Sequence, residues 1–469
     1  MEENENLEAL DYESIQEKRS DELMELLDSR NVKELQRRME DMNEYDLAQF
    51  LTELEDNRMP MVFRLLSKDT AADVFANFEA PEQERIINAI TDSELAGIVE
   101  DLYVDDAVDM LEELPANVVK RVMRAATPQT RSLINQYMHF PENSAGSIMT
   151  SEYVDLKKYM SVKDSIARIR RIGEDKETIY VCFVISSTRQ LEGIVTVKDL
   201  LLSDDDTVIE DLMDRNVIFA TTTEDQESVS EKFSDYDLMA MPVVDTEGRL
   251  VGIVTVDDVI DVMEQETTED FELMAAMTPS DKPYARTGIL EIYRNRIPWL
   301  LFLMLSATFT SMILTHFEDM LAVCAALVAF IPMLMGTGGN SGAQASTAVI
   351  RSLSLGDTEP RDAMSVVWKE LRVAFCCGVT LSAVNFVKML LLDGMLLGND
   401  GVTVAVAATV SLSILFIVMF AKVVGSMLPI AAEKIGVDPA VMANPLISTL
   451  TDAVSLLIYI YIAKLILHI

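Results

Sequence analysis

Residues 191–201 read LEGIVTVKDLL, and residues 250–260, which begin 59 positions later, read LVGIVTVDDVI. In both stretches the run Ile-Val-Thr-Val has the β-branched composition of a buried strand, and the acid that follows is suited to capping a helix. Another apolar run precedes each stretch, at 180–185 and 241–245, and a turn separates the two runs. The repetition predicts two copies of one small α/β unit, at about 143–205 and 206–265.

This arrangement resembles a tandem pair of CBS domains over residues 139–265, a regulatory module that senses nucleotides or ions. In CBS modules that bind adenosine nucleotides, the Thr and Asp of the Gly-Ile-Val-Thr-x-x-Asp signature contact ribose and phosphate. The resemblance therefore leaves ATP open as a ligand, at Thr196, Asp199, Thr255 and Asp258. The alternative is that these side chains only cap the helices that follow, and capping is expected in either case.

Residues 1–138 are rich in helix-forming residues and lack strand-like alternation. One pattern recurs at Asp46-Leu-Ala-Gln-Phe-Leu, Ala71-Ala-Asp-Val-Phe and Glu94-Leu-Ala-Gly-Ile-Val, which begin roughly 24 residues apart. One helical hairpin per repeat predicts an all-α superhelix over residues 35–138, after an acidic tail at 1–34. An irregular helical bundle is the alternative.

The acidic residues are concentrated before Tyr284, where 65 Asp and Glu face 27 Lys and Arg; from Tyr284 onward the counts are 12 and 11. Such acidity favours cations as partners and argues against nucleic acid. The chain shows no nucleophile–base pair, phosphate-binding loop or metal-hydrolase spacing, so we do not expect an enzyme. Its start has neither a basic nor an apolar run, so we expect the acidic part to stay in the cytoplasm.

The rest of the chain predicts an α-helical membrane domain with five spans. Each of five apolar segments reaches the ~20 residues that cross a bilayer. These segments are 297–317, 320–350, about 366–392, 401–430 and 439–467. Lys and Arg gather before the first span and after the second and fourth, and are missing from the two alternate loops. The positive-inside rule then predicts a plasma-membrane protein with its N-terminus in the cytoplasm and its C-terminus outside.

Asp452 lies inside the last predicted span, with 13 uncharged residues before it and 11 after it. An ionised carboxylate at that depth costs at least ~2.5–3.5 kcal/mol, so it needs a cation, a basic partner or water. Lysines 388, 422 and 464 lie toward the span ends and are expected to snorkel to the interface. The sequence therefore favours ion coordination by Asp452 over a buried ion pair.

Two further membrane motifs carry polar groups. Residues 336–347 read GTGGNSGAQAST, in which Asn340 and the hydroxyls offer neutral oxygens to a cation. Gly338 and Gly342 also form a GxxxG pattern, which indicates close helix packing, and Pro332 upstream is expected to bend the helix. The last span opens with Asp438-Pro439, a good helix cap.

Over residues 35–469 the chain resembles the MgtE family of magnesium channels. The resemblance rests on the order of segments and on two motifs, Gly-Gly-Asn-x-Gly at 338–342 and Asn-Pro-Leu-x-x-x-x-x-Asp at 444–452. It implies a homodimer in the lipid bilayer, with a plug helix at 266–296, a pore domain at 297–469 and a pore on the two-fold axis. The residues that it implies for Mg²⁺ in the pore are Asp452, Asn340, Asn444 and Asp438.

The resemblance also implies regulatory Mg²⁺ sites on acids of the N domain, the CBS pair and the plug. These acids are Asp73, Asp105, Asp109, Asp225, Glu227, Asp237, Asp258, Asp261, Glu266, Glu269 and Asp270.

The resulting hypothesis is a magnesium uptake channel that cytoplasmic Mg²⁺ closes by bridging these acids. A CBS-gated secondary transporter of divalent cations is the alternative, and the presence of a single deep acid favours the channel. A membrane-anchored sensor that transports nothing is a third possibility, against which the polar residues of the last span argue.

Overall fold

The computed structural model describes residues 12–280, 284, 287–396, 401–442 and 444–468. The chain divides into two compact units, Met1–Ile260 and Asp261–Ile469. Each unit has hydrophobic cores of its own.

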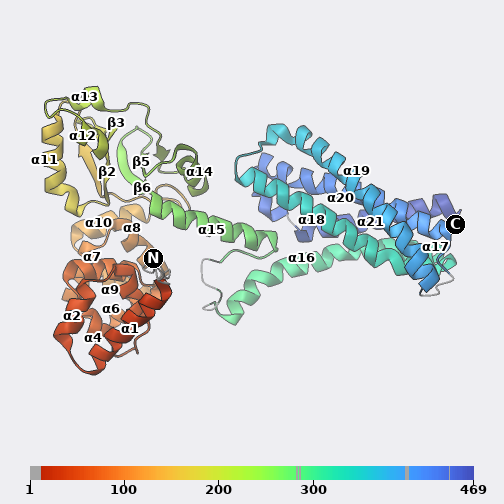
Figure 1. Ribbon diagram of the computed structural model, residues 1–469, viewed down its shortest axis with the longest axis horizontal. Helices are drawn as coiled ribbons and strands as arrows, with labels where there is room; N and C mark the ends of the chain where they lie inside the picture. The colour runs from red at the N-terminus through yellow and green to blue at the C-terminus, as the bar shows by residue number, and fades with distance from the viewer. Residues whose placement is uncertain (1–11, 281–283, 285–286, 397–400, 443, 469) are drawn as a thin grey trace, which may run out of the picture. The chain divides into compact units, whose positions relative to one another are not determined.

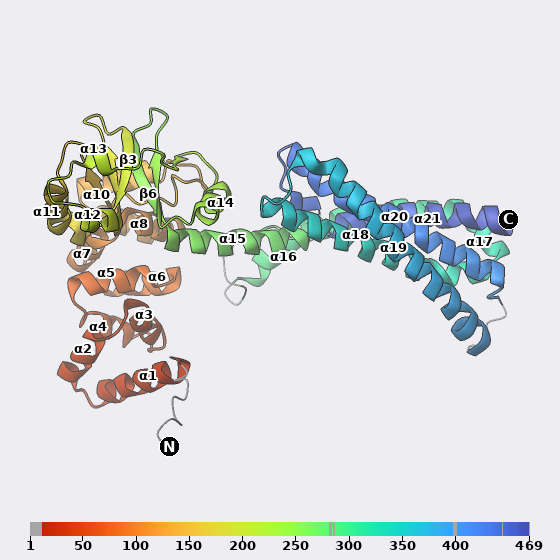
Figure 2. The ribbon, with the colours of Figure 1, turned by 45° about the horizontal axis from the view of Figure 1, so that its top comes forward.

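The first unit opens with short helices (Figure 1). They are α1 Tyr12–Asp28, α2 Val32–Glu40, α3 Glu44–Thr52, α4 Met59–Phe63, α5 Lys68–Ala76, α6 Ala80–Ala89, α7 Asp92–Asp101, α8 Val104–Glu113, α9 Ala116–Ala125 and α10 Pro128–Tyr137. From α3 onward each helix packs against the next but one, so that α3, α5, α7 and α9 form one layer and α4, α6, α8 and α10 another. Figure 2 shows this stacking from the side. It is the superhelix of helical pairs that the repeats predict.

Side-chain caps mark the starts of several of these helices, among them α3, α5, α7 and α10. Thr91 and Glu94 form a reciprocal capping box at the start of α7. Hydrogen bonds from Thr91 and Arg64 lower the pKa of Glu94 to about 2. Leu23 of α1 is buried with Leu35 in the common core, so the acidic start of the chain contributes a helix to this unit.

Two three-stranded sheets with their helices complete the first unit. The first contains β1 Tyr153–Leu156, α11 Val162–Ile172, η1 Gly173–Asp175, β2 Thr178–Ile185, β3 Leu191–Thr196 and α12 Val197–Leu202; α13 Ile209–Leu212, β4 Ala220–Thr221, α14 Gln226–Tyr236, β5 Ala240–Val244 and β6 Leu250–Thr255 follow. In both sheets the first strand runs parallel to the second, and the second pairs antiparallel with the third. The duplication predicted from the sequence is therefore a duplication of the fold.

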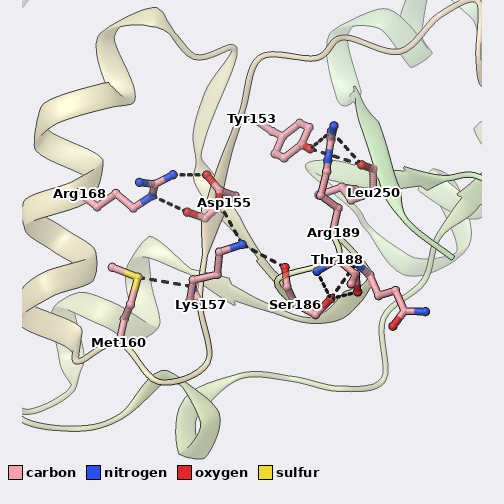
Figure 3. Close-up of polar contacts among 10 residues, drawn as sticks. Tyr153, Asp155, Lys157, Met160, Arg168, Ser186, Thr188, Arg189 and Leu250 are labelled. Carbon is pink, nitrogen blue, oxygen red and sulfur yellow. Dashed lines mark hydrogen bonds and ion pairs between the residues drawn. The ribbon is translucent and has the colours of Figure 1, made fainter.

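Arg189 joins the two repeats (Figure 3). Its guanidinium donates to the Tyr153 hydroxyl at 3.0 Å and to the Leu250 carbonyl at 3.1 Å, and the Leu250 amide donates back to the Arg189 carbonyl at 2.9 Å. Beside them Arg168 pairs with Asp155. Arg189 thus bonds the first repeat to the second, whereas the pair of Arg168 and Asp155 lies within the first.

The second unit is helical. After α15 (Val256–Met274), which begins in the first unit, come α16 Ile289–His316, α17 Glu318–Val323, η2 Ala325–Phe330, α18 Ile331–Ser354, η3 Pro360–Asp362, α19 Ala363–Lys388, the π-helical η4 Met389–Leu396, α20 Val404–Lys434, η5 Pro439–Met442 and α21 Asn444–Leu467. Helix α20 packs against α18, α19 and α21. Buried side chains of α18, α20 and α21 form most of the core.

Among the described residues, four segments are long and apolar enough to cross a membrane: Ile289–His316, Pro360–Leu396, Val404–Lys434 and Pro439–Leu467. Helix α18, with 24 residues, is also long enough, but glycines and polar residues make it less apolar. The predicted count of five spans therefore depends on α18 and stays a prediction.

The predicted second span, 320–350, is divided among α17, η2 and α18. The chain leaves the helical conformation at Cys324, whose φ is −131° and ψ 80°. Pro332 lies in the first turn of α18, so it begins this helix and does not bend it as predicted. Asp438 caps η5 as predicted, because its Oδ1 accepts a hydrogen bond from the Ala440 amide at 2.7 Å.

Candidate cation site

Glycines bring α18 close to α21 and α20. A Cβ atom added to Gly338 would lie 2.8 Å from Ser455 Oγ, and one added to Gly342 would lie 2.7 Å from Ile447 Cγ2. At Gly336, by contrast, an added Cβ would meet nothing within 4 Å. Gly338 and Gly342 therefore serve the close helix packing that the GxxxG pattern indicates.

These contacts bring Asn340 and Asp452 to the same level. Gly338 faces Ser455, and Gly342 faces Ile447 and Thr451, so Asn340 on α18 and Asp452 on α21 lie between the same two contacts. Asn340 is exposed and Asp452 is partly exposed in the single chain. A carboxylate and an amide oxygen at one level are suitable ligands for a hard cation.

Not all polar residues of α21 join this site. Ser455 and Tyr459 are buried, and the Tyr459 hydroxyl donates to the Leu327 carbonyl at 2.9 Å. The Tyr459 hydroxyl therefore belongs to the helix packing, whereas Ser455 Oγ lies against Gly338 and, among the described residues, has no hydrogen-bond partner. The Asn444 side chain lies outside the described residues.

A second group of candidate ligands gathers at Asp438, which is exposed. Burial raises the pKa of Asp270 to about 6, and the charges of Asp438 and Glu266 add to this effect, whereas Arg351 opposes it. The structure therefore brings Asp270 of α15 near Asp438. Glu269, on the turn that also carries Glu266 and Asp270, is half-buried, and Asp261 is exposed.

A third acidic group lies in the first unit, at the start of α8. Burial raises the pKa of Asp105 well above its ordinary value, and the charges of Asp106 and Asp258 raise it further. Burial and the charges of Asp258 and Asp73 raise the pKa of Asp106 to about 6. Burial, with the charges of Asp258 and Asp257, raises the pKa of Glu177 to about 8.

The acids of this group lack full compensation. Among the described residues, Asp105 Oδ1 and Glu177 Oε2 are buried and accept no hydrogen bond. The pKa of Asp109 also rises, to about 7, through burial and the charge of Asp106. The side chain of Asp109 is exposed, so solvent screens its interaction with the neighbouring charges.

The sequence placed Asp73, Asp105, Asp109 and Asp258 among the regulatory acids, and the structure brings them together from distant segments. It also adds two groups that the sequence reasoning missed. Asp106 could have been found, because it neighbours Asp105 and lies three residues before Asp109 on one helix. Glu177 has no local signal, since only the fold brings it to α8.

Other predicted acids lie apart in the single chain. Asp225 caps the start of α14, where it accepts a hydrogen bond from the Glu227 amide at 3.0 Å, and Asp237 ends this helix with φ 51°. Eleven residues of helix separate these ends by about 16 Å. Among the described residues, no group of three or more His, Cys, Asp or Glu is arranged to hold a metal ion.

A cavity of about 570 Å³ is lined by the first CBS repeat and by Met239 of the second. Its lining residues are Tyr180, Val181, Thr196, Val197, Lys198, Leu201, Leu202 and Met239. Thr196 forms a reciprocal cap with Asp199, and Thr255 donates to Asp258, so the predicted capping is confirmed in both repeats. Of the four predicted nucleotide residues, Thr196 alone lines this cavity.

Comparison with known proteins identifies the family of this chain. Residues 331–462 match the family model described as a divalent cation transporter, residues 42–143 that of the MgtE intracellular N domain, and residues 209–265 that of the CBS domain. The magnesium transporter MgtE of Thermus thermophilus is 37% identical over 458 residues, which cover 97% of this chain and 100% of that protein. The chain belongs to the MgtE family.

Further relatives agree with the MgtE assignment. The magnesium transporter MgtE of Bacillus subtilis is 30% identical over 443 residues, 94% of this chain and 96% of that protein. The crystal structure of the soluble part of a magnesium transporter is 29% identical, with a TM-score of 0.52, and the match covers 54% of this chain and 99% of that one. MgtE proteins are described as transporters rather than enzymes, and the apolar helices make this chain a multi-pass membrane protein.

The acidic group at α8 makes a prediction about pH. In the folded state Asp106 and Glu177 keep protons up to pH values near 6 and 8, whereas the unfolded chain releases them near pH 4. The folded state thus binds more protons between these values, so without divalent cations the first unit should lose stability as pH rises from about 5 to about 8. Calorimetry of the full chain in EDTA measures this as a falling melting temperature of that unit.

Glu177→Gln should flatten this pH dependence, because it removes one of the groups that titrate. Asp206→Asn, a change at an exposed acid of the same unit, should leave it unaltered. A melting temperature that rises with pH over this range would contradict the prediction.

Proposed function

We propose that this chain transports Mg²⁺ across the cell membrane, as a channel that cytoplasmic Mg²⁺ closes. The observation that supports this most directly is the position of Asp452 and Asn340, at one level on the close-packed helices α18 and α21. Membership in a family described as divalent cation transporters supports it further.

Magnesium chemistry agrees with so few ligands. Mg²⁺ gives up its water reluctantly, so a largely hydrated ion needs only one or two carboxylates. In the proposed homodimer, a second copy supplies a second Asp452, and the two carboxylates repel unless a divalent cation lies between them. The partial exposure of Asp452 and the exposure of Asn340 in a single chain agree with a pore completed by a second copy. Asp438 and Asn444 would attract the ion at the cytoplasmic end.

The regulatory part of the proposal rests on the acidic groups. At low Mg²⁺ the carboxylates around Asp105 repel one another, and a bound divalent cation removes that repulsion. Mg²⁺ thus has the different affinities for two states that a ligand-driven switch requires. The remaining regulatory ligands that the family resemblance implies, from Asp225 to Asp270, stay part of this proposal.

The proposed topology follows the charge pattern of the loops. It has five spans including α18, a cytoplasmic N-terminus and an extracytoplasmic C-terminus. The domain limits proposed from the sequence complete it, with the pore domain beginning near residue 297.

A secondary transporter of divalent cations is the second candidate. One observation favours it: Glu370 is a further acid in a candidate span, on α19, where the sequence reasoning had counted Asp452 alone. A current that follows the membrane voltage without a sodium or proton gradient would decide for the channel.

We also propose that the cavity of the first CBS repeat binds an adenine nucleotide. Tyr180 offers an aromatic face for the base, Thr196 a hydroxyl and Lys198 a positive charge for phosphate. Tyr180→Ala should weaken binding of a fluorescent ATP analogue by about tenfold, the loss of roughly one stacking contact. Tyr236→Ala, at an exposed tyrosine away from the cavity, is the control. Equal affinities in both variants would remove the cavity as the site.

Asp452 provides the direct test of transport. Asp452→Ala should reduce Mg²⁺ flux into proteoliposomes to background, because the intramembrane carboxylate that compensates the ion is gone. Size-exclusion chromatography should show an unchanged assembly. Glu433→Ala, at an exposed acid near the end of α20, should keep its flux. Normal flux through Asp452→Ala would rule out this role.

Regulation is tested in the first unit. Asp105→Asn combined with Asp258→Asn removes two of the carboxylates proposed to bind the bridging Mg²⁺, so the Mg²⁺ concentration that halves the flux should rise by about tenfold. Asparagine at 258 can still accept the hydrogen bond from Thr255 that caps α15. Asp204→Asn combined with Asp206→Asn removes two exposed charges from the same unit and should change nothing. Unchanged inhibition in the first pair would discard the bridging mechanism.

A further inference from the structure

Lys422 is a buried lysine among the membrane helices. Its side chain is 7% exposed, and Nζ lies 3.5 Å from Oε2 of Glu370, whose side chain is 16% exposed. The expectation that Lys422 snorkels to the interface is wrong, because the Glu370 carboxylate of α19 holds the ammonium of α20 inside the protein. A charged pair inside such helices is costly to bury and marks a functional position by default.

The pair is not a tight structural ion pair. Glu370 Oε2 is buried and, among the described residues, accepts no hydrogen bond. By comparison, Lys388 at the end of α19 and Asp393 of η4 approach to 2.9 Å, and Lys388 is 39% exposed. The ammonium of Lys422 thus balances the charge of the Glu370 carboxylate without a hydrogen bond to Oε2. Another cation can therefore compete with the ammonium for this carboxylate.

The pair lies at the level of the candidate cation site. The carbonyl of Ala421, the residue before Lys422, would be 3.2 Å from a Cβ added to Gly342. Gly342 also packs against Ile447 and Thr451 of α21. Lys422 therefore sits on α20 at the level where α18 and α21 present Asn340 and Asp452.

The pair is not needed to hold α19 against α20. Gly378 allows α19 to approach the backbone of Leu415 closely. Farther along, the Ser382 hydroxyl donates to the Ser411 carbonyl, and the Asn385 amide donates to the Ser411 hydroxyl at 3.0 Å. These contacts fasten the two helices without any charge.

We propose that Lys422 acts as a tethered cation. Its ammonium neutralises the charge of the Glu370 carboxylate, so that a divalent cation in the membrane domain binds at Asp452 and not at Glu370. The pair is thereby a determinant of where the domain binds cations, and this inference rests on the proposed function. Charges interact more strongly in a region of low dielectric than in water. The charges of Lys422 and Glu370 therefore also affect how tightly Asp452 binds its ion.

The proposal assigns different effects to the two halves of the pair. Lys422→Met leaves the Glu370 carboxylate without its cation, so the full chain in nanodiscs should bind one more Mn²⁺ per chain. The bound Mn²⁺ is counted by the loss of the electron paramagnetic resonance signal of the free ion. Glu370→Gln leaves the ammonium of Lys422 unbalanced at the level of Asp452, so half-maximal transport should need about three- to tenfold more Mg²⁺. Lys422→Met combined with Glu370→Gln removes both charges and should restore the wild-type Mn²⁺ count and Mg²⁺ requirement.

Lys369→Met is the matched control, since it removes an exposed lysine one position from Glu370 and should change neither readout. Lys422→Arg keeps a cation and should bind no additional Mn²⁺. An unchanged Mn²⁺ count in Lys422→Met, or a double variant as impaired as Glu370→Gln, would overturn the proposal in favour of a structural pair. Should Lys422→Met not fold, the comparison of Glu370→Gln with the double variant decides alone.

The Mn²⁺ count also separates this inference from the proposed function. In an Asp452→Asn background the additional Mn²⁺ of Lys422→Met should still appear, because it binds at Glu370. If Asp452 proved irrelevant to transport, the proposed function would fail while this result stood. If the additional Mn²⁺ were missing although Asp452→Ala abolished transport, only the tethered cation would be refuted.

Discussion

A carboxylate that is taken out of water must have a positive charge or a proton beside it, and this requirement connects the separate parts of the chain. Asp452 meets it inside the membrane helices, where an ion is the proposed partner. In the first unit, burial and neighbouring acids raise the pKa of Asp105 and of Glu177, which favours a proton on these carboxylates when no cation is bound. Glu370 meets it with Lys422. The same physical need is thus met by a lysine at Glu370, favours a proton at Asp105 and Glu177, and is met by a transported cation at Asp452 in the proposed function.

Close helix packing determines which carboxylates can be reached. Gly338 and Gly342 let α18 lie directly on α21 and α20, and this contact sets the level of Asn340 against that of Asp452. Tyr459 and Ser455, although on the same helix as Asp452, are buried between the helices. Small residues therefore decide both the approach of the helices and the identity of the polar groups left uncovered.

The sequence predicted well whatever depends on local pattern. The duplicated stretches at 191 and 250 became equivalent strands, and Thr196, Thr255 and Asp438 cap the helices that they precede. The sequence predicted wrongly where a long side chain can point either to the membrane interface or into the protein. Lys422 looked like a residue near a span end, but the partner that turns it inward is on another helix, and no periodicity along α20 indicates Glu370.

The candidate acids show the same division. Composition and motif order by themselves determined an acidic helical and CBS part, a membrane part and a carboxylate at 452, because charge, hydropathy and repeats are properties of the chain. Only the tertiary structure decided that Glu177 joins Asp105, that Asp225 and Asp237 stand at opposite ends of α14, and that Glu370 holds Lys422. The reason is that the energy of a carboxylate depends on its depth and on its nearest charges, and these neighbours come from segments that the sequence leaves far apart.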